Sequence, residues 1–246
     1  MSSRVVLITG GGTGIGRAAA ELFAERGWQV MISGRREAPL AEVSGSNPNI
    51  GYRVADVSAA GAAETLVAHT IDSYGRLDAL VNNAGGFTAA TLDTVDEDQL
   101  VRLFRINVFA PAQLLRAALP HLKVTGGSVV NVTSAVAQRP QAPASAYYGA
   151  SKSALDHLTR SWAAELAGVG VRVNAVAPGP TDTPIQNLGG SPEETTRHKQ
   201  MQAEHLPLRR LGEPGEVARW IHLLADPASG WVTGQVLAVD GGMTVA

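Results

Sequence analysis

The chain has 246 residues, of which 45% are hydrophobic and 17% are charged, and its formal net charge is -2. Because no block of like charge stands out, the composition argues against a nucleic-acid or anionic-membrane partner and favours small molecules. The absence of cysteine excludes disulfides and thiolate metal sites. No apolar run reaches signal-peptide or membrane-spanning length, so we expect a cytoplasmic protein with one domain, residues 1–246.

Short β-branched runs alternate with helical patterns along the chain. Most of the runs are continuously apolar, as in strands that helices cover on both faces. This alternation predicts an α/β protein with a single-domain, doubly wound Rossmann fold, a seven-stranded, mainly parallel sheet and a ligand site beyond the carboxyl ends of its strands. The seven candidate strands are RVVLIT (4–9), WQVMIS (28–33), GYRVAD (51–56), LDALVNN (77–83), GSVVNVT (127–133), GVRVNAV (170–176) and QVLAVD (235–240).

Glycines and caps predict where several helices begin and end. The first helical pattern, GRAAAELFAERG, should end at Gly27, and the long pattern from Ser151 should end at Gly168. Residues 180–210 are too long for an ordinary connection, so we expect a substrate loop or lid there. Within it, Ser191 followed by Pro192 and Glu194 predicts the start of a short helix.

A glycine-rich turn, TGGGTGIGRA, follows the first strand and opens the first helix. A dinucleotide pyrophosphate needs a tight turn without side chains, backbone N–H donors and the positive end of a helix dipole. Gly10, Gly14 and Gly16 meet these needs, although a flexible loop is the simpler alternative. No Lys-Ser or Lys-Thr pair closes the turn, so a Walker phosphate-binding loop is excluded.

The second strand ends in ISGRRE, with Gly34 and Arg35 where an acid would bind the ribose of NAD. A guanidinium binds phosphate in a bidentate manner, so NADP(H) is favoured over NAD(H), with Arg36 as a second contact. The alternative is a solvated pair of surface arginines.

The segment SAYYGASK contains two tyrosines and a lysine. On a helix that advances about 100° per residue, Tyr148 and Lys152 share a face, whereas Tyr147 does not share it with Lys152. A phenol with a pKa near 10 is a poor acid or base at neutral pH, and a nearby ammonium lowers that pKa. The spacing therefore fits an acid/base pair, with an ordinary helix-surface pair as the alternative.

Six landmarks occur in order along the chain: TGGGTGIG (9–16), DV (56–57), NNAG (82–85), NVTS ending at Ser134, YGASK (148–152) and PG (178–179). With them the chain resembles the short-chain dehydrogenase/reductase family over nearly its whole length. The C-terminal segments RRLGEPGEVARWIHLLAD and WVTGQVLAVDGG are similar to the 3-oxoacyl-acyl-carrier-protein reductase group of that family.

The resemblance implies reversible interconversion of a carbonyl and an alcohol by hydride transfer. Tyr148 would be the general acid/base, Lys152 would lower its pKa and bind the nicotinamide ribose, Ser134 would hold the substrate oxygen and Asn107 would anchor a relay water. It also implies cofactor contacts from Thr9, Gly10, Gly14, Ile15, Gly16, Arg35, Asp56, Val57, Asn83, Ala84, Gly85, Tyr148, Lys152, Pro178, Gly179, Thr181 and Thr183. In this comparison Asp56 would meet the adenine amino group and Thr183 the carboxamide.

Two departures from the family pattern concern the substrate. The stretch from Ser134 to Tyr148 is one residue longer than usual; if the insertion lies beside the site, Tyr147 lines the substrate cavity. Carrier-protein reductases have basic residues where this chain has Thr125 and Val169, with only Lys123 and Arg172 nearby. The main hypothesis is therefore a small or medium-sized, fairly apolar ketone, aldehyde or alcohol, and the alternative is a 3-oxoacyl thioester.

Other readings of the same residues are weaker. VTSAVA lacks the glycines of a serine-hydrolase elbow, and the glycosylation sequon at Asn131 falls on a buried strand. None of the six histidines has zinc-ligand spacing, so we expect no metal and assign all six to structural or surface positions. A non-catalytic dinucleotide sensor would have no need for the Tyr-Lys pair. The family resemblance further implies a homo-oligomer, a tetramer or dimer.

Overall fold

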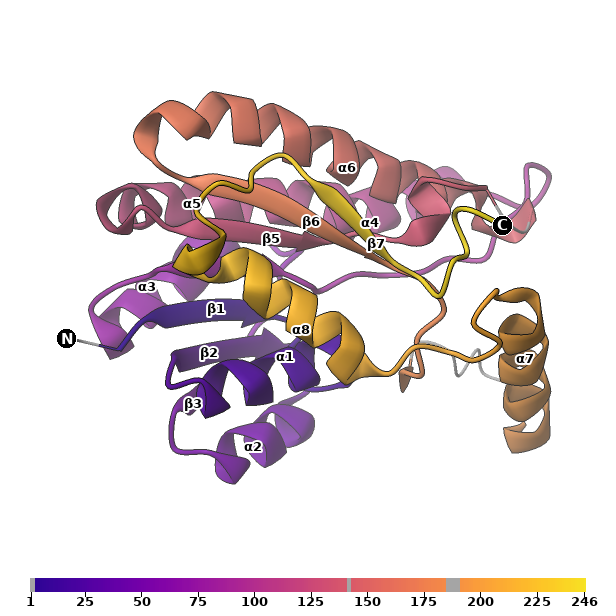
Figure 1. The fold of residues 1–246 in the computed structure, drawn as a ribbon, viewed down its shortest axis with the longest axis horizontal. Helices are drawn as coiled ribbons and strands as arrows, with labels where there is room; N and C mark the ends of the chain where they lie inside the picture. Colours follow the sequence, from indigo (N-terminus) through magenta and orange to yellow (C-terminus); the bar gives the residue numbers. More distant parts are fainter. Residues whose placement is uncertain (1–2, 141–142, 185–190) are drawn as a thin grey trace.

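Seven strands form a sheet in the order β3-β2-β1-β4-β5-β6-β7, in which every neighbouring pair is parallel. The computed structural model describes residues 3–140, 143–184 and 191–246. The predicted doubly wound Rossmann fold is confirmed (Figure 1). The strands are β1 Val5–Thr9, β2 Gln29–Gly34, β3 Ile50–Val54, β4 Ala79–Asn82, β5 Ser128–Val132, β6 Arg172–Pro178 and β7 Val236–Val239.

Helices cover both faces of the sheet because its strands are apolar on both. Along β1, Val6 and Ile8 pack in one buried cluster with α1, α2 and α8, whereas Val5 and Leu7 pack in another with α3, α5 and α6. The α-helices are α1 Gly14–Glu25, α2 Glu37–Ser46, α3 Ala62–Tyr74, α4 Glu97–Phe104, α5 Ala110–Thr125, α6 Ala146–Leu166, α7 Pro192–His205 and α8 Pro214–Ala225.

None of the helices in the described part of the chain combines the length and apolarity that a bilayer crossing needs.

The two predicted glycine helix ends differ in outcome. Gly27 has a φ of 80° and follows the C-cap of α1, so that prediction is confirmed. The end at Gly168 is wrong, because α6 stops at Leu166 and the chain continues in a 3-10 turn, Ala167–Val169. The left-handed residue that closes this region is Gly170, with a φ of 78°, since the backbone reverses only after the extra turn.

The predicted lid segment contains a capped helix, α7, as expected. The Ser191 hydroxyl accepts a hydrogen bond from the Glu194 N–H at 3.2 Å, and the Ser191 N–H donates to Glu194 Oε2 at 2.7 Å. Residues 185–190 lie outside the described residues. α7 stands away from the layered body of the molecule (Figure 1), and it has no buried residue.

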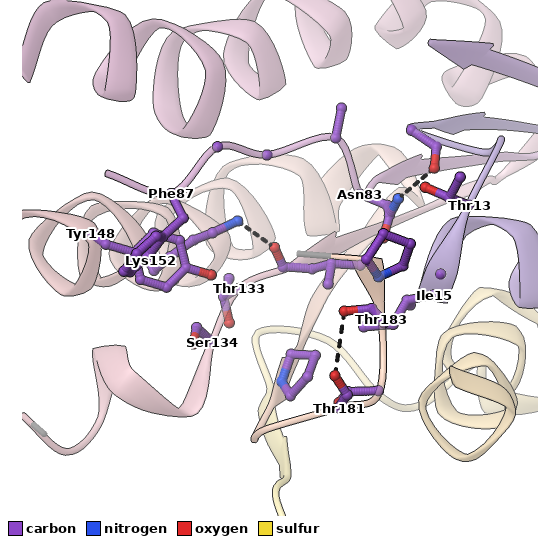
Figure 2. A pocket seen from close by; sticks show the side chains of 18 of the residues that line it. Thr13, Ile15, Asn83, Phe87, Thr133, Ser134, Tyr148, Lys152, Thr181 and Thr183 are labelled. Atoms are coloured by element: carbon purple, nitrogen blue, oxygen red, sulfur yellow. Dashed lines mark hydrogen bonds between the residues drawn. The ribbon is translucent and has the colours of Figure 1, made fainter. Parts of the chain in front are cut away.

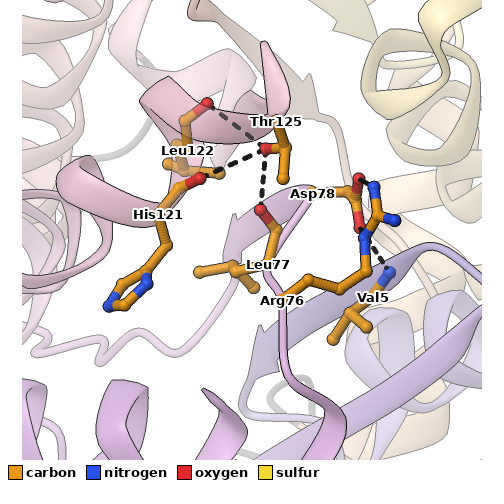
Figure 3. Close-up of polar contacts among 7 residues, drawn as sticks. All are labelled: Val5, Arg76, Leu77, Asp78, His121, Leu122 and Thr125. Carbon is orange, nitrogen blue, oxygen red and sulfur yellow. Dashed lines mark hydrogen bonds and ion pairs between the residues drawn. The ribbon is translucent and has the colours of Figure 1, made fainter.

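Polar groups at the amino ends of β1 and β4 are paired with one another (Figure 3). The Asp78 carboxylate accepts hydrogen bonds from the Val5 N–H at 2.9 Å and from the Arg76 guanidinium at 2.6 and 2.8 Å. The Thr125 hydroxyl donates to the Leu77 carbonyl at 2.8 Å, which ties the end of α5 to the same place. This end of the sheet is therefore fixed by a satisfied network.

Candidate active site

A crevice opens between the carboxyl ends of β1 and β4, where the strand order reverses. The Thr9 hydroxyl accepts hydrogen bonds from the Asn83 N–H at 3.1 Å and the Ala84 N–H at 3.0 Å. The Asn83 side chain donates to the Thr9 and Gly10 carbonyls at 2.9 and 3.1 Å. The two strand ends are thus joined at the topological switch point, where ligands of doubly wound sheets bind.

A cavity of about 930 Å³ runs along this edge of the sheet. It brings together residues that lie far apart in the sequence, from the glycine-rich turn to α7. The predicted site residues that line it are Gly10, Gly14, Ile15, Arg35, Asp56, Val57, Asn83, Ala84, Gly85, Ser134, Tyr148, Lys152, Pro178, Gly179, Thr181 and Thr183.

Three predicted site residues lie behind the cavity lining rather than in it: Thr9, Gly16 and Asn107. Thr9 joins the two strand ends, as described above. A Cβ at position 16 would lie 2.2 Å from the Gly10 carbonyl oxygen, so only glycine allows this turn to pack on α1. These residues shape the site from outside, and sequence alone did not separate them from lining residues.

The glycine-rich turn presents the N-terminus of α1 to the cavity. Gly10 and Gly14 have φ values of 68° and 55°, a left-handed backbone that glycine adopts without strain. The first turn of α1 has no acidic side chain, so its positive dipole end stays available to an anion. The described residues therefore fit a pyrophosphate at this point.

The end of the cavity near β2 and β3 combines arginines with a carboxylate. Arg35, Arg36 and Asp56 all line it. Asp56 Oδ1 accepts from the Ser58 hydroxyl at 2.6 Å and from the Ser58 N–H at 2.9 Å. The hydroxyl bond, opposed by burial and aided by the charge of Arg35, lowers the pKa of Asp56. The carboxylate is consequently ionised at neutral pH.

Tyr148, Lys152 and Ser134 lie together at the other end of the cavity (Figure 2). Tyr148 and Lys152 come from adjacent turns of α6, and the lysine Nζ is 5.9 Å from the tyrosine ring centroid. Nζ donates to the Val132 carbonyl at 2.9 Å. Complete burial lowers the pKa of Lys152 to about 8, against the opposing charge of Asp156. A Cβ at Gly85 would come within 3.3 Å of Nζ, so glycine keeps the side of the ammonium that faces this loop uncrowded.

The expected lowering of the Tyr148 pKa by Lys152 is not what the structure gives. Burial raises the pKa of the Tyr148 phenol, and the hydrogen bond with Ser134 only opposes it. The reason is that the low dielectric disfavours a phenolate and the ammonium is bonded to a carbonyl instead. Phe87 packs edge-on against the Tyr148 ring at 5.3 Å between centroids. The phenol is thereby kept in its neutral, proton-donating form.

Asn107 lies in a π-helical turn, Arg105–Phe109. Its side chain accepts from the Gly86 N–H at 2.9 Å and donates to the Gly86 carbonyl and the Ser151 hydroxyl, both at 3.0 Å. These bonds use both N–H donors of the amide and one lone pair of Oδ1, and the anchoring of a relay water at Asn107 stays a prediction. Its geometry fits a positioning role for the loop that carries Gly85 and Gly86.

Two of the six histidines, which the sequence pattern assigns to structural or surface positions, line the cavity. His198 and His205 lie on one face of α7 and line the cavity. Helical spacing in the sequence places them on one face with Met201 and Gln202, but the sequence does not show which face of α7 lines the cavity. Tyr147, by contrast, is not among the described residues that line it. Lining residues that sequence reasoning missed include Phe87, Ile106, Val136, Arg139, Leu206 and Met243.

Comparison with known proteins agrees with this geometry. Residues 10–244 match the family model described as enoyl-(acyl carrier protein) reductase. The chain is 35% identical over 251 residues to a 3-oxoacyl-[acyl-carrier-protein] reductase of Thermotoga maritima, covering 100% of this chain and 99% of the relative.

Two solved structures are also similar. A Caenorhabditis elegans short-chain dehydrogenase/reductase of unknown function, solved with cofactor, is 33% identical with a TM-score of 0.92 and covers 100% of this chain and 96% of that chain. A Brucella melitensis 3-ketoacyl-(acyl-carrier-protein) reductase complexed with NADH is 29% identical with a TM-score of 0.91 over 99% of both chains.

The fold, the glycine-rich turn and the cavity at the switch point define a dinucleotide-binding oxidoreductase. The matches over nearly the entire length show which family of these enzymes it is: the chain belongs to the short-chain dehydrogenase/reductase family.

Proposed function

We propose that this protein is an NADP(H)-dependent oxidoreductase that interconverts a ketone or aldehyde and the corresponding alcohol. The observation that carries the proposal is the convergence of Ser134, Tyr148 and Lys152 at the end of the cavity opposite Arg35. A bound nicotinamide supplies the hydride in reduction and accepts it in oxidation. The protein's own residues bind the cofactor and move the proton.

Tyr148 is proposed as the general acid in reduction. Its phenol donates a proton to the carbonyl oxygen of the substrate, while Ser134 holds that oxygen by a hydrogen bond. The pKa of Tyr148, which burial raises, keeps the proton on the phenol until the substrate oxygen gains negative charge. Lys152 stabilises the phenolate that forms and binds the nicotinamide ribose, and Asn107 positions the Gly86 backbone.

Cofactor recognition is assigned along the rest of the cavity. Gly10, Gly14 and the N-terminus of α1 hold the pyrophosphate. Asp56 and Val57 border the adenine. Arg35 and Arg36 bind the additional phosphate of NADP. Because a relative with this fold is complexed with NADH, the fold does not decide the choice, and the arginines carry it. The remaining proposed contacts are Ile15, Asn83, Ala84, Gly85, Pro178, Gly179, Thr181 and Thr183.

The overall organisation follows from the same proposal. Residues 1–246 act as one dinucleotide-binding and catalytic domain, and residues 180–210 act as a substrate lid that carries α7 over the cavity. We further propose a cytoplasmic carbonyl reductase that assembles as a homo-oligomer, a tetramer or dimer. Size-exclusion chromatography with light scattering tests the assembly, and a monomeric mass would contradict it.

A 3-oxoacyl thioester reductase is the second candidate. The Thermotoga maritima relative favours it. Two positions argue against a carrier-protein substrate, because both carry uncharged side chains and offer no positive charge to an acidic carrier. They are Thr125, whose hydroxyl donates to the Leu77 carbonyl, and Val169, which is 44% exposed.

The deciding experiment follows cofactor oxidation with NADPH and NADH across ketones, aldehydes and 3-oxoacyl thioesters. We expect turnover of simple carbonyls with NADPH, lost in Tyr148→Phe while cofactor binding is kept. Preference for thioesters would select the second candidate. Equal use of NADH would contradict the role of Arg35, and Arg35→Ala is expected to raise the KM for NADPH about tenfold without changing that for NADH. Cofactor binding with no turnover of any substrate would indicate a non-catalytic sensor.

A further inference from the structure

The cavity wall beyond Ser134 carries basic side chains from separate parts of the chain. Arg139 follows the short 3-10 turn after Ser134, and His198 and His205 come from α7, seven residues apart on one face. Asp56 is the single acidic residue among the described residues that line the cavity. It follows β3 at the far edge of the sheet, whereas Ser134 follows β5. The substrate end is therefore basic.

Arg139 and His205 border the same small apolar cluster. Arg139 Nη1 donates to the Met243 carbonyl at 2.8 Å, and Met243 packs with Ala135 and Leu206. Leu206 is the C-cap of α7 and directly follows His205. Contacts thus connect the Ser134 turn, the C-terminal segment and the end of α7, and both Arg139 and His205 line the cavity.

Both groups retain hydrogen-bonding capacity toward a ligand. His205 Nδ1 is 2.6 Å from the Met201 carbonyl; because a carbonyl only accepts, the proton is on Nδ1, and Nε2 can donate to a carboxylate only in the imidazolium form. Within the described part of the chain, the Arg139 guanidinium has no hydrogen bond or ion pair besides the one to Met243. The remaining donors of its planar fork suit a carboxylate.

The cavity is also lined by the polar Ser145 and Gln202 and by apolar side chains, among them Phe87, Ile106, Val136, Met201, Leu206 and Met243. A neutral hydrocarbon would leave the basic groups without a partner, and a small hydrophilic ion would leave the apolar wall uncovered. We propose that the substrate is an amphipathic carbonyl compound with an apolar body and a carboxylate, which Arg139 and the α7 histidines bind.

This inference rests on the proposed function and specifies its substrate. In reduction, the ketone carbon gains the hydride and its oxygen gains the proton from Tyr148, while the carboxylate is unchanged. The product is the hydroxy acid. The carboxylate contributes binding and fixes which end of the molecule faces Ser134.

The test compares phenyl ketones that carry a carboxylate two to four carbons from the carbonyl with their methyl esters, using NADPH. We expect at least one acid to have a kcat/KM roughly tenfold or more above its ester, as a charge-assisted hydrogen bond would give. Esters reduced as well as or better than every acid would overturn the inference and leave the proposed function standing. If neither acids, esters nor simple ketones were reduced, the proposed function itself would fail.

Variants locate the effect. In Arg139→Gln, kcat/KM for the acid should fall about tenfold to a hundredfold, and that for the ester should stay within about twofold. His198→Gln should act in the same direction, and it keeps the test available if Arg139→Gln does not fold. Arg197→Gln is the matched control, since Arg197 is the neighbouring α7 cation but is not among the described residues that line the cavity. Equal losses for acid and ester in Arg139→Gln would reduce its role to holding Met243 and would overturn the assignment.

Discussion

The two ends of the parallel sheet hold buried charge in opposite ways. At the amino end, the carboxylate of Asp78 is 8% exposed and is bonded to both Arg76 and the Val5 N–H. At the carboxyl end, Lys152 is 3% exposed, and its Nζ bonds to the Val132 carbonyl rather than to a carboxylate. The amino end pairs its buried carboxylate with a cation. The carboxyl end holds a buried ammonium without an ion pair, and burying that charge costs free energy.

This difference separates stability from activity. Breaking a buried ion pair destabilises the fold, because removing one partner leaves the other without compensation. A buried cation without an ion-pair partner adds little to the free energy of unfolding. Such groups are typical of functional sites, where the charge is available to the reaction. We therefore expect variants at the amino end to change unfolding without changing the rate, and variants at the carboxyl end to do the reverse.

The largest expected effect is that of Lys152→Met. Removal of the ammonium takes away the charge that stabilises the Tyr148 phenolate, so kcat/KM should fall about 10²- to 10⁴-fold. The free energy of unfolding should change by less than about 1 kcal/mol, because loss of the Val132 hydrogen bond offsets the relief of burying a charge. Steady-state kinetics and urea unfolding measure the two quantities. A loss of stability as large as that of an amino-end variant would break the comparison.

Asp78→Ala is the matching change at the amino end. It leaves the Val5 N–H without its 2.9 Å acceptor and the Arg76 guanidinium without its carboxylate. We expect a loss of about 2 to 3 kcal/mol in the free energy of unfolding. At temperatures where the variant is folded, kcat/KM should stay within about twofold of the parent. Thr125→Val, which removes the hydroxyl that contacts the Leu77, His121 and Leu122 carbonyls, should lose less, about 1 kcal/mol.

Asp156→Asn should sharpen the comparison through pH. Asp156 is 5% exposed and lies one turn beyond Lys152; burial raises its own pKa, opposed by Thr133 and the charges of Arg160 and Lys152. Its negative charge raises the pKa of Lys152 against burial. Without it, the Lys152 pKa falls further below about 8, and less of the cation remains at alkaline pH.

The measurement is the pH dependence of kcat/KM. We expect the alkaline limb to move to lower pH, with a several-fold loss at pH 8.5 and little change at pH 6.5, where Lys152 is protonated in both proteins. A uniform loss at all pH values would show that Asp156 acts only through packing.

The sequence predicted the elements that depend on local chemistry. Apolar strand runs, the turn at Gly10 and the Ser191 cap are set by neighbouring residues, and the structure has them where the pattern indicates. Helical spacing likewise identified Tyr148 and Lys152 as a pair on one face, and both line the cavity.

Residues whose surroundings the sequence does not show depend on distant contacts. Asn107 turns to Gly86, 21 positions away, and His205 reaches the cavity because Leu206 packs on Ala135 and Met243. Neither contact leaves a periodic signal. The prediction for the end of α6 was wrong because a 3-10 turn follows the helix, so that the left-handed glycine is Gly170 and not Gly168.

The smallest expected effect concerns a titratable group that breaks the pairing rule at the amino end. His222 of α8 packs against Phe23 at 4.8 Å and near Trp28 at 6.3 Å between ring centroids. Its buried Nε2 has no hydrogen-bond partner within the described residues. Burial lowers the pKa of His222, with Asp226 opposing and Arg26 and Arg4 adding to the effect.

The sign of the pH effect follows from that lowered pKa. Below pH 6.5 the unfolded chain protonates this histidine more readily than the folded protein does, so stability is lost as the pH falls. In His222→Phe, which keeps the aromatic contact, the loss between pH 7.5 and pH 5.5 should be smaller than in the parent. Because the ring is only half-buried, the difference should stay below about 1 kcal/mol. Urea unfolding at the two pH values measures this difference. If the free energy of unfolding changed equally in the variant and the parent, the His222 ring would be paired or solvated as fully as Asp78 is paired.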